Sequence, residues 1–445
     1  MEFLFERFGA YATAVAFQHE GRAFTYEQII STTSDYAAQL RESGVHAGEA
    51  VVVPGEYSPE VFCLILAIWR AGSVAIPLTT ASVIDLETVL EITGAGWMAN
   101  ASPDGVAISH MEGRGAPPIL QKFAATGNPG LILFSSGSTG EPKAILHDME
   151  VVSRKFRPAG SPMVAIAFLM LDHFGGINTV LGMLSRTGTV VTVADRSVAT
   201  VCRAVQDYRV EVLPTTPTFL TLLARSGAMH EFDLSSLRRI TYGTEVMPQG
   251  TLDRVRNAFP GVRLQQTYGL SELGVMSSKS REDGSLWVAI GGEGFETKVV
   301  DGILWIRSDY SMVGYLNAPN PFDNERWLNT GDMVEVDGEW LRILGRDSDL
   351  INVAGQKVFP AEVEQAILEV DNVRDVAVYG EPHALLGQIV VARVATLEPE
   401  PVLAVKQRIR TECGRTLAAY KLPTKVILAT DSELYSHRHK KNRRA

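Results

Sequence analysis

The stretch LILFSSGSTGEPKAILHD, residues 131–148, decides how the rest of the chain is interpreted. An apolar run enters a loop of glycines and small hydroxyl residues, and Lys143 follows that loop. Glycines let a backbone approach a bulky anion, and successive backbone N–H groups can form an anion-binding nest. The stretch therefore favours a phosphate-binding loop, although a flexible Gly/Ser connection has the same composition.

The loop does not match the P-loop of kinases and GTPases. That pattern ends in Gly-Lys-Ser/Thr, whereas Gly137, Gly140 and Lys143 follow one another at intervals of three and form no Gly-Lys pair. The AIL segment after Lys143 predicts a strand, so a helix dipole is not secured for the phosphate. A P-loop kinase or GTPase is disfavoured.

The first 270 residues alternate short β-rich apolar runs with longer helical patterns, which predicts α/β layers with a substantially parallel sheet. The window 61–69 is the most apolar, but it is too short to span a bilayer and is closed by Arg70. It predicts a buried helix with Gly72 as its C-cap. The candidate strands are 50–53, 164–168, 189–194 and 210–213, and the helix-like windows are 199–208 and 251–259.

The pattern changes after residue 285. The stretches 298–308 and 334–344 each carry Asp-Gly between alternating apolar runs, which predicts two hairpins with two-residue turns. Residues 361–370 predict a helix behind Pro360, with Val363, Ala366, Ile367 and Val370 on one face. About a hundred residues suit a small separate α+β domain, so the boundary is predicted between Arg346 and Asp349.

Charge and composition narrow the functional classes. The net charge of −10 argues against nucleic acid as the main partner, because backbone phosphates require a basic surface. The acidic N-terminus does not resemble a signal peptide, and no membrane segment is visible, so a cytoplasmic location is expected. The three cysteines lack metal-ligand spacing and are expected to be buried in a reduced state: Cys63, Cys202 and Cys413.

Three further stretches suggest a nucleotide. In TYGLSE, 267–272, Tyr268 could stack on a base and Glu272 could reach a Mg²⁺ that bridges phosphates. In NTGD, 329–332, Asp332 is predicted in a tight turn, where it could accept both ribose hydroxyls. Arg346 in GRDSDLI is a second candidate partner for sugar or phosphate. Each stretch alone is weak, because surface turns with Asp and Gly are common.

In this order and spacing, the motifs resemble the adenylate-forming (AMP-binding) superfamily of acyl-CoA synthetases, stand-alone adenylation domains and firefly luciferase. The resemblance runs from about residue 20 to the C-terminus and rests on SSGSTGEPK, YGLSE, LNTGD and GRDSDLINVAGQKVFPAEVE. It implies a large N-terminal domain of layered α/β subdomains, which binds ATP and the acyl group, and a small mobile C-terminal α+β domain. The implied boundaries are 1–346, a hinge at 347–349, and 350–445.

The resemblance assigns nucleotide-binding roles. It implies that Tyr268 stacks on adenine with Gly269 beside it, that Ser271 touches phosphate, and that Glu272 binds Mg²⁺. Asp332 and Arg346 would hold the ribose. The loop that holds the β- and γ-phosphates of ATP would consist of Ser135, Ser136, Gly137, Ser138, Thr139, Gly140 and Lys143, and the segment lining the adenine and acyl pockets of Gly243, Thr244 and Glu245.

The acyl end is matched by LMLDHFGGIN, 169–178. By resemblance, His173 and Phe174 lie beside the acyl pocket with Gly243, and His173 orients the carboxylate or gates the pocket. A lone histidine at a strand end is otherwise a structural residue. Amino-acid-activating relatives carry Phe-Asp in this region, whereas here Asp172 precedes His173. The match favours an apolar or aromatic acid.

The last motif of the family supplies a catalytic lysine. Aligning Glu433 with the start of that motif places Lys441 at the catalytic position and Lys440 where glycine is usual, so Lys441 is preferred and Lys440 is the alternative. A lysine there would offset negative charge in the adenylation transition state. A solvated basic tail would have the same composition.

The resemblance also implies a second active arrangement. Ser348 stands at the hinge position, where Asp or Lys is usual, and can still absorb a dihedral change. Domain rotation would replace Lys441 with Gly355, Gln356 and Lys357 for the CoA half-reaction.

These motifs predict an ATP- and Mg²⁺-dependent acid–thiol ligase. A carboxylate would form acyl-AMP and pyrophosphate, and the acyl group would then pass to a thiol, with CoA preferred. One alternative keeps adenylation but transfers the acyl group to a carrier-protein thiol or an amine. Another is a degenerate member that binds nucleotide or acyl-AMP without adenylating.

Overall fold

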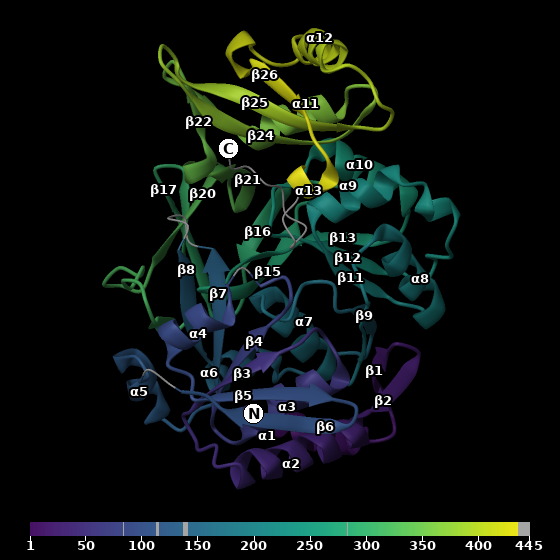
Figure 1. Cartoon of the computed structure of the whole chain (residues 1–445). Coiled ribbons are helices and arrows are strands. Elements are labelled where there is room, and N and C mark those ends of the chain that lie inside the picture. The colour runs from purple at the N-terminus through teal and green to yellow at the C-terminus, as the bar shows by residue number, and fades with distance from the viewer. Residues whose placement is uncertain (83, 113–114, 137–140, 283, 435–445) are drawn as a thin grey trace.

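The computed structural model describes residues 1–82, 84–112, 115–136, 141–282 and 284–434 (Figure 1). The described residues form four β-sheets with helices packed around them. Three sheets belong to the first 346 residues, and the fourth belongs to the unit at the top of Figure 1. The predicted α/β fold with a smaller C-terminal α+β unit is confirmed.

The first sheet contains the stretch that opened the sequence analysis. Strands β7 and β8 pair in antiparallel register from Gly130 opposite Asp148 to Ser136 opposite Pro142. The predicted strand after Lys143 is therefore confirmed, and the glycine-rich loop joins two paired strands. Its residues 137–140 lie outside the described ranges. The sheet order is β19 (Gly314–Tyr315), β8 (Pro142–Asp148), β7 (Gly130–Ser136), β4 (Val74–Leu78), β3 (Ala50–Pro54), β5 (Trp97–Ser102) and β6 (Gly105–His110).

The second sheet is parallel except at one edge, where β2 pairs with β1 in antiparallel fashion. The predicted parallel sheet is confirmed, with β9 and β10 shorter than the apolar runs that predicted them and β11 shifted by two residues. The run 189–194, for example, contributes only Thr189–Val191. The order is β13 (Arg263–Gln266), β12 (Arg239–Tyr242), β11 (Val212–Thr215), β9 (Val164–Ile166), β10 (Thr189–Val191), β1 (Val15–His19) and β2 (Arg22–Thr25).

Helix α3 (Pro59–Arg70) lies in the core of this part of the chain. All of its residues except Arg70 are buried, which confirms the buried helix predicted from the apolar window 61–69. The helix ends at Arg70 and its C-cap is Ala71 rather than the predicted Gly72, which follows the cap with φ +70°, a left-handed conformation that glycine adopts without strain. Among the described residues, no helix is both long and apolar enough to cross a bilayer. All three cysteines are buried and free.

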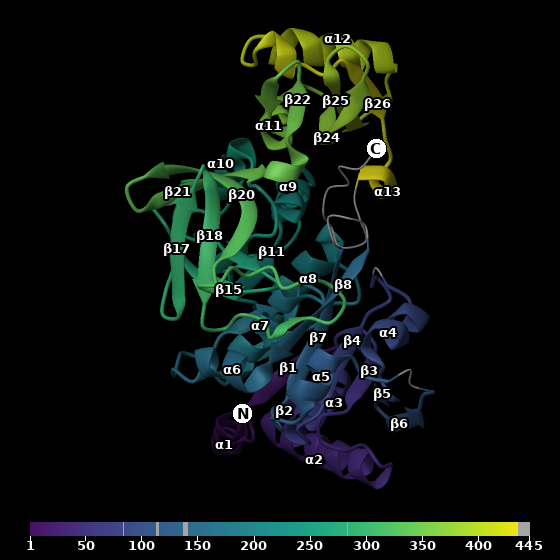
Figure 2. The same cartoon turned by 90° about the vertical axis from the view of Figure 1, so that its left-hand side faces the viewer.

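The other helices of the first 346 residues cover these two sheets (Figures 1 and 2). They are α1 (Glu2–Ala10), α2 (Tyr26–Glu42), α4 (Leu86–Thr93), α5 (Pro118–Ala124), α6 (Met149–Ser153), the 3₁₀ turn η1 (Arg154–Phe156), α7 (Phe174–Leu184), α8 (Val198–Tyr208), α9 (Pro217–Arg225), η2 (Ala228–His230) and α10 (Gln249–Ala258).

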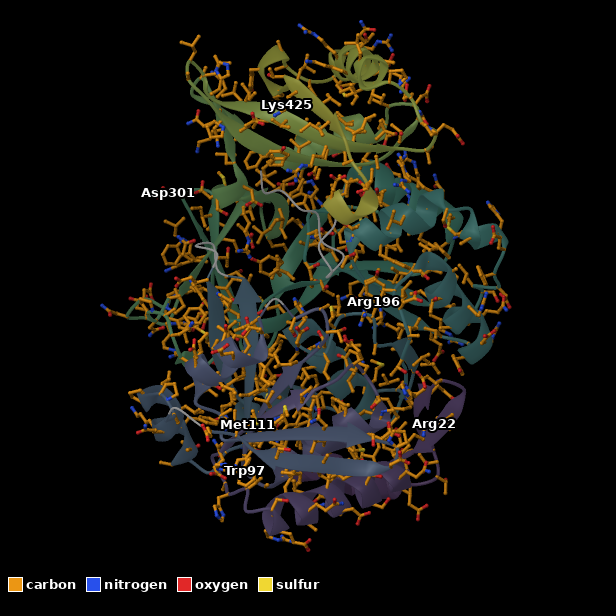
Figure 3. All side chains as sticks on the ribbon, in the orientation of Figure 1. Arg22, Trp97, Met111, Arg196, Asp301 and Lys425 are labelled. Atoms are coloured by element: carbon orange, nitrogen blue, oxygen red, sulfur yellow. The ribbon has the colours of Figure 1, made fainter. Side chains whose placement is uncertain are left out.

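The third sheet carries the two predicted hairpins, and both are confirmed. Asp301 and Gly302 form the first turn, at the position that Figure 3 labels with Asp301. In the second hairpin Asp337 pairs with Trp340, so the turn residues are Gly338 and Glu339 rather than the predicted Asp-Gly. The order is β14 (Tyr268–Leu270), β15 (Gly274–Ser280), β16 (Trp287–Gly291), β21 (Trp340–Arg346), β20 (Leu328–Asp337), β18 (Ile303–Ser308) and β17 (Phe295–Val300).

The C-terminal unit begins after the 3₁₀ turn η3 (Asp347–Asp349). Figure 2 shows its sheet beneath α12 (Val402–Cys413), with α11 (Pro360–Leu368) toward α9 and α10. Helix α11 buries Val363 and Ile367, as predicted, whereas Ala366 is only partly buried. The remaining elements are β22 (Ile351–Val353), β23 (Gln356–Val358), β24 (Val373–His383), β25 (Gly387–Thr396), η4 (Ala419–Lys421), β26 (Lys425–Leu428) and α13 (Asp431–Leu434).

Two arginines join the C-terminal unit to the helices below it. Arg225, at the end of α9, donates hydrogen bonds to the carbonyl oxygens of Leu368 and Val373. Arg254 in α10 forms an exposed ion pair with Glu369, at 2.8 Å between Nη2 and Oε2. Carbonyl groups at and beyond the end of a helix such as α11 need hydrogen-bond donors. The two hydrogen bonds from Arg225 are therefore expected to contribute more stability than the exposed ion pair of Arg254.

Replacing Arg225 with methionine is expected to lower the melting temperature by a few degrees, because hydrogen bonds from a charged donor contribute about 1.5–3 kcal/mol. Arg254→Met is the matched control, since an exposed ion pair contributes about 0.2–1 kcal/mol. Differential scanning calorimetry of both variants provides the comparison. Equal shifts would contradict the assignment of Arg225 as the main connection.

Candidate active site

A cavity of about 720 Å³ lies between the second sheet, helix α7 and the strand β14. Alternate residues of β9, β11 and β12 form its floor, and one face of α7 lies opposite. Many residues predicted from separate motifs therefore share one space. Those that line it are Ser135, Lys143, His173, Phe174, Gly243, Thr244, Tyr268, Gly269, Ser271, Glu272 and Arg346.

The residues predicted to hold the nucleoside contact one another. Tyr268 is buried and its hydroxyl donates to Asp332 Oδ2, and Arg346 Nε lies 3.3 Å from Asp332 Oδ1. Burial raises the pKa of Asp332, and the adjacent Arg346 guanidinium opposes that rise. Burial also raises the pKa of Tyr268, so its phenol remains protonated and acts as the donor. The group offers an aromatic ring, a carboxylate and a cation at one place.

Asp332 reaches this position by a different route from the one predicted. It lies in strand β20, not in a tight turn, directly opposite Arg346 of β21. Just after Asp332, the pairing register of the strand shifts between Met333 and Val334. Just before it, Gly331 has φ +71°. The hairpin therefore brings together two charged residues that are far apart in sequence.

Glu272 lies at the other side of the nucleoside group. The hydroxyl of Tyr315, in β19, donates to Glu272 Oε1 at 2.6 Å, and Lys143 Nζ lies 5.2 Å from the centroid of the Tyr315 ring. Burial, followed by the charge of Glu272, raises the pKa of Tyr315 and keeps it a donor. One carboxylate together with substrate phosphates is a usual Mg²⁺ environment, so these residues fit the metal. Among the described residues, no group of three or more His, Cys, Asp or Glu could form a metal site by itself.

The two residues predicted to lie beside the acyl pocket, His173 and Phe174, lie at the start of helix α7. His173 is the N-cap of that helix rather than a strand end as predicted, and its Nδ1 accepts from the backbone N–H of Gly175 at 3.1 Å. Phe174 is buried, and its ring centroid lies 4.7 Å from that of His147. Burial lowers the pKa of His147 to about 3, so this side chain is neutral packing beside Phe174. His173 and Phe174 both line the cavity, as the sequence predicted.

Comparison with known protein families identifies the family to which this chain belongs. The model of the AMP-binding enzyme family matches residues 4–316, and that of its C-terminal domain matches residues 362–441. The chain belongs to the AMP-binding enzyme family. The superfamily predicted from the motifs is confirmed.

Individual relatives of this AMP-binding enzyme are CoA ligases by name. Long-chain-fatty-acid–CoA ligase FadD13 of Mycobacterium tuberculosis is 27% identical, with 91% of this chain and 89% of that protein covered. Indoleacetate–CoA ligase of Aromatoleum aromaticum is 28% identical, covering 93% of this chain and 91% of that protein. The structure of the anthranilate CoA ligase AuaEII in complex with anthranoyl-AMP superimposes with a TM-score of 0.84 at 20% identity. That alignment covers 99% of this chain and 95% of the other, and it establishes the fold.

Within this AMP-binding enzyme, the Gly243–Glu245 segment divides between two places. A Cβ on Gly243 would lie 2.6 Å from the carbonyl oxygen of Thr267, so only glycine fits where these chain segments meet. Glu245 does not line the cavity. Its Oε2 accepts from the backbone N–H and hydroxyl of Thr218, at 3.2 and 2.6 Å, at the start of α9. Glu245 therefore positions the segment through a helix N-terminus.

Several predicted residues lie away from the cavity. Ser348 is exposed in η3, and Gly355, Gln356 and Lys357 are exposed at the hairpin of β22 and β23. Lys441 and Lys440 lie outside the described residues, as do Gly137, Ser138, Thr139 and Gly140. The roles predicted for these residues stay predictions.

Tyr315 is the contact residue that the sequence analysis missed. It occupies a two-residue strand paired with β8 and belongs to none of the recognised motifs. Its relation to Glu272 arises because β19 lies at the sheet edge beside the phosphate loop. Tyr315 could have been found from the sequence by predicting that the short segment at 314–315 pairs with β8.

Replacing Tyr315 with phenylalanine is expected to raise the Mg²⁺ concentration for half-maximal activity by about tenfold, since loss of a residue that orients a metal ligand commonly costs 10–100-fold. The measurement is pyrophosphate release as a function of Mg²⁺ at saturating ATP. Tyr310→Phe is the matched control, because Tyr310 packs on Phe295 and does not line the cavity. An unchanged Mg²⁺ requirement in Tyr315→Phe would show that Glu272 needs no such support.

Proposed function

We propose that this enzyme activates a carboxylic acid as acyl-AMP, releases pyrophosphate, and transfers the acyl group to CoA. The main supporting observation is that one cavity joins Tyr268, Glu272 and Arg346 to a compartment under α7 that is lined by both apolar and polar side chains. A nucleotide and an organic acid can thus meet without crossing solvent. The predicted acid–thiol ligase also agrees with the relatives, which are named as CoA ligases.

In the first half-reaction, the acid lies along the sheet with its carboxylate toward the nucleoside group. Tyr268 would stack on the adenine, and Asp332 with Arg346 would hold the ribose, which fixes the α-phosphate relative to that carboxylate. Lys143 lies beside Tyr315 at the phosphate end and would oppose the negative charge of the departing pyrophosphate. Glu272 would hold Mg²⁺, which neutralises phosphate charge when bound.

The second half-reaction would use the C-terminal unit differently. Ser348 lies in an exposed 3₁₀ turn between β21 and β22, where few contacts oppose a change in dihedral angles. We propose that the chain consists of an N-terminal domain at 1–346, a hinge at 347–349 and a mobile C-terminal domain at 350–445. Rotation at the hinge would bring Gly355, Gln356 and Lys357 to the acyl-AMP. Support comes from the exposed position of their hairpin, formed by β22 and β23.

The test is a panel of carboxylic acids with ATP and Mg²⁺, read as pyrophosphate release and as ATP–pyrophosphate exchange. The panel is then repeated with CoA, with a carrier protein and with amines. Exchange followed by CoA-dependent product supports the proposal. Transfer only to the carrier protein or only to amines would replace the acceptor, and nucleotide binding without exchange with any acid would favour the non-adenylating alternative.

A further inference from the structure

The end of the cavity remote from the nucleoside group carries two positive charges, Arg239 and Arg186. Arg239 begins β12 and lies four residues before Gly243, which is about 13 Å along an extended strand. Arg186 follows the end of α7, and the helix from Gly175 to Met183 is about 12 Å long. Lys155 comes from η1, and its ammonium group donates to the carbonyl oxygen of Val275, the register partner of Gly269 on β14, so this charge lies nearer the nucleoside group. All three line the cavity.

No carboxylate balances these charges. Among the described residues that line the cavity, Glu272 is the one acid, and it lies at the phosphate end with Tyr315. Within the described part of the chain, no ion pair joins Lys155, Arg186 or Arg239 to an acidic side chain. The Nε atom of Arg239 is buried and has no hydrogen-bond partner there.

The surroundings of Arg239 and Lys155 oppose their positive charge. Burial, followed by the charges of Arg263 and Arg186, lowers the pKa of Arg239. Burial lowers the pKa of Lys155 to about 8, although its ammonium group donates to Asn178 Oδ1 at 2.8 Å and to the carbonyl oxygen of Val275. Clustered, partly desolvated cations without a counter-ion are costly, and an anion placed among them would reverse that cost.

The wall between the two ends carries apolar side chains beside polar ones such as Asn178, Thr179 and Thr241. It includes Ala165, Leu169, Met183 and Pro214, which offer no hydrogen bonds from their side chains to a polar substrate body. A substrate lying along this wall would present its middle to apolar side chains and its remote end to the cations.

We propose that the acid substrate carries a second carboxylate, which Arg239 and Arg186 bind while the first carboxylate is adenylated. This inference rests on the proposed function and names the substrate class of the same site. It extends the apolar or aromatic acid expected from the sequence to an apolar body with an anionic far end. Arginine forks suit a carboxylate because they bind it through two parallel hydrogen bonds.

The test compares matched monoacids and diacids: hexanoate with adipate, octanoate with suberate, and decanoate with sebacate. The readout is kcat/KM in ATP–pyrophosphate exchange without CoA. At the chain length that fits best, the diacid is expected to exceed its monoacid by about 10–100-fold, the equivalent of one charge-assisted hydrogen-bonded contact. Arg239→Met is expected to abolish that preference and leave the monoacid unaffected or improved.

Two further variants keep the test decisive. Arg263→Met is the matched control, because Arg263 is the register partner of Arg239 on β13 but does not line the cavity, so the diacid preference should persist. Arg186→Met removes an exposed member of the group and should reduce the preference even if Arg239→Met fails to fold. Equal use of monoacids and diacids by the wild type would overturn the inference. So would variants whose only defect is a raised KM for CoA, which would assign the cations to the CoA phosphates.

Direct binding separates this inference from the proposed function. Isothermal titration calorimetry with AMP present measures the affinity for suberate and octanoate in the wild type and in Arg239→Met. Arg239-dependent preference for the diacid without any exchange would support the charged subsite while refuting adenylation. Exchange with monoacids and no diacid preference in binding would do the reverse.

Discussion

Replacing Lys441 with alanine is expected to lower the rate of acyl-AMP formation by about 10²–10³-fold, the cost of removing one preorganised charge that stabilises a transition state. Thioester formation from supplied acyl-AMP and CoA should stay within about twofold of the wild type, because only the first half-reaction develops charge on the α-phosphate. ATP–pyrophosphate exchange measures the first step, and CoA-dependent consumption of synthetic acyl-AMP measures the second.

Lys440 supplies the matched control for this experiment. It is the adjacent lysine in HKKNRR and has the same charge and helix propensity, so Lys440→Ala tests whether position or basicity matters. We expect Lys440→Ala to retain exchange. If Lys440→Ala loses exchange and Lys441→Ala keeps it, the motif begins one residue earlier than we assign it. Loss of both half-reactions in Lys441→Ala would contradict the division of roles between the two domain positions.

Local pattern was sufficient to predict most of the fold. The 131–148 stretch predicted two strands around a loop, and the paired register of β7 and β8 bears this out, because each strand carries its own apolar signal. The same holds for the helix at 61–69, where continuous burial requires continuous apolar sequence. These elements depend on residues that are neighbours in the chain, so a short window contains the information.

Features set by strand pairing could not be read from short windows. The second hairpin has its turn at Gly338 and Glu339 because the register of β20 and β21 pairs Asp337 with Trp340. His173 was expected at a strand end, but a bonded Gly175 N–H makes it a helix cap. In both cases the sequence pointed to the correct residues. Their hydrogen-bond partners determined whether each residue lies in a turn, in a strand or at a helix cap.

The candidate site shows the same division. Tyr268, Glu272, Asp332 and Arg346 belong to recognisable motifs in three separate segments. Tyr268, Glu272 and Arg346 line one cavity, and Asp332 contacts Tyr268 and Arg346. Tyr315 and the cations at 155, 186 and 239 belong to no motif, because their importance arises only from what the sheets bring beside them. The sequence therefore predicted the nucleotide end of the cavity better than the end that selects the acid.

If Asp332 accepts hydrogen bonds from two ribose hydroxyls, replacing it with alanine is expected to lower kcat/KM for ATP by about 10²–10⁴-fold, because each hydrogen bond to a charged acceptor contributes about 1.5–3 kcal/mol. A structural effect will accompany this loss. The buried Tyr268 hydroxyl would lose its acceptor, at a cost of about 1–3 kcal/mol in the free energy of unfolding. The loss of the Arg346 contact should add little, since half of that side chain is exposed.

A comparison of nucleotides separates the two effects. If Asp332 binds the ribose hydroxyls, the wild type should prefer ATP to 2′-deoxy-ATP and 3′-deoxy-ATP, and Asp332→Ala should use all three nearly equally. Asp332→Asn is the matched control, because the amide keeps an acceptor for Tyr268 but removes the charge from the ribose contact. It should retain the melting temperature of the wild type more closely than Asp332→Ala and still lose most of the discrimination. A variant that unfolds at a lower temperature but discriminates among the nucleotides as the wild type does would assign Asp332 to the support of Tyr268 alone.

Burial raises the pKa of the Asp332 carboxyl, so ionising it in the empty site is unfavourable. The two ribose donors, together with Arg346, would then stabilise the charged form, and nucleotide binding would be coupled to the loss of a proton from Asp332 wherever that site is still protonated.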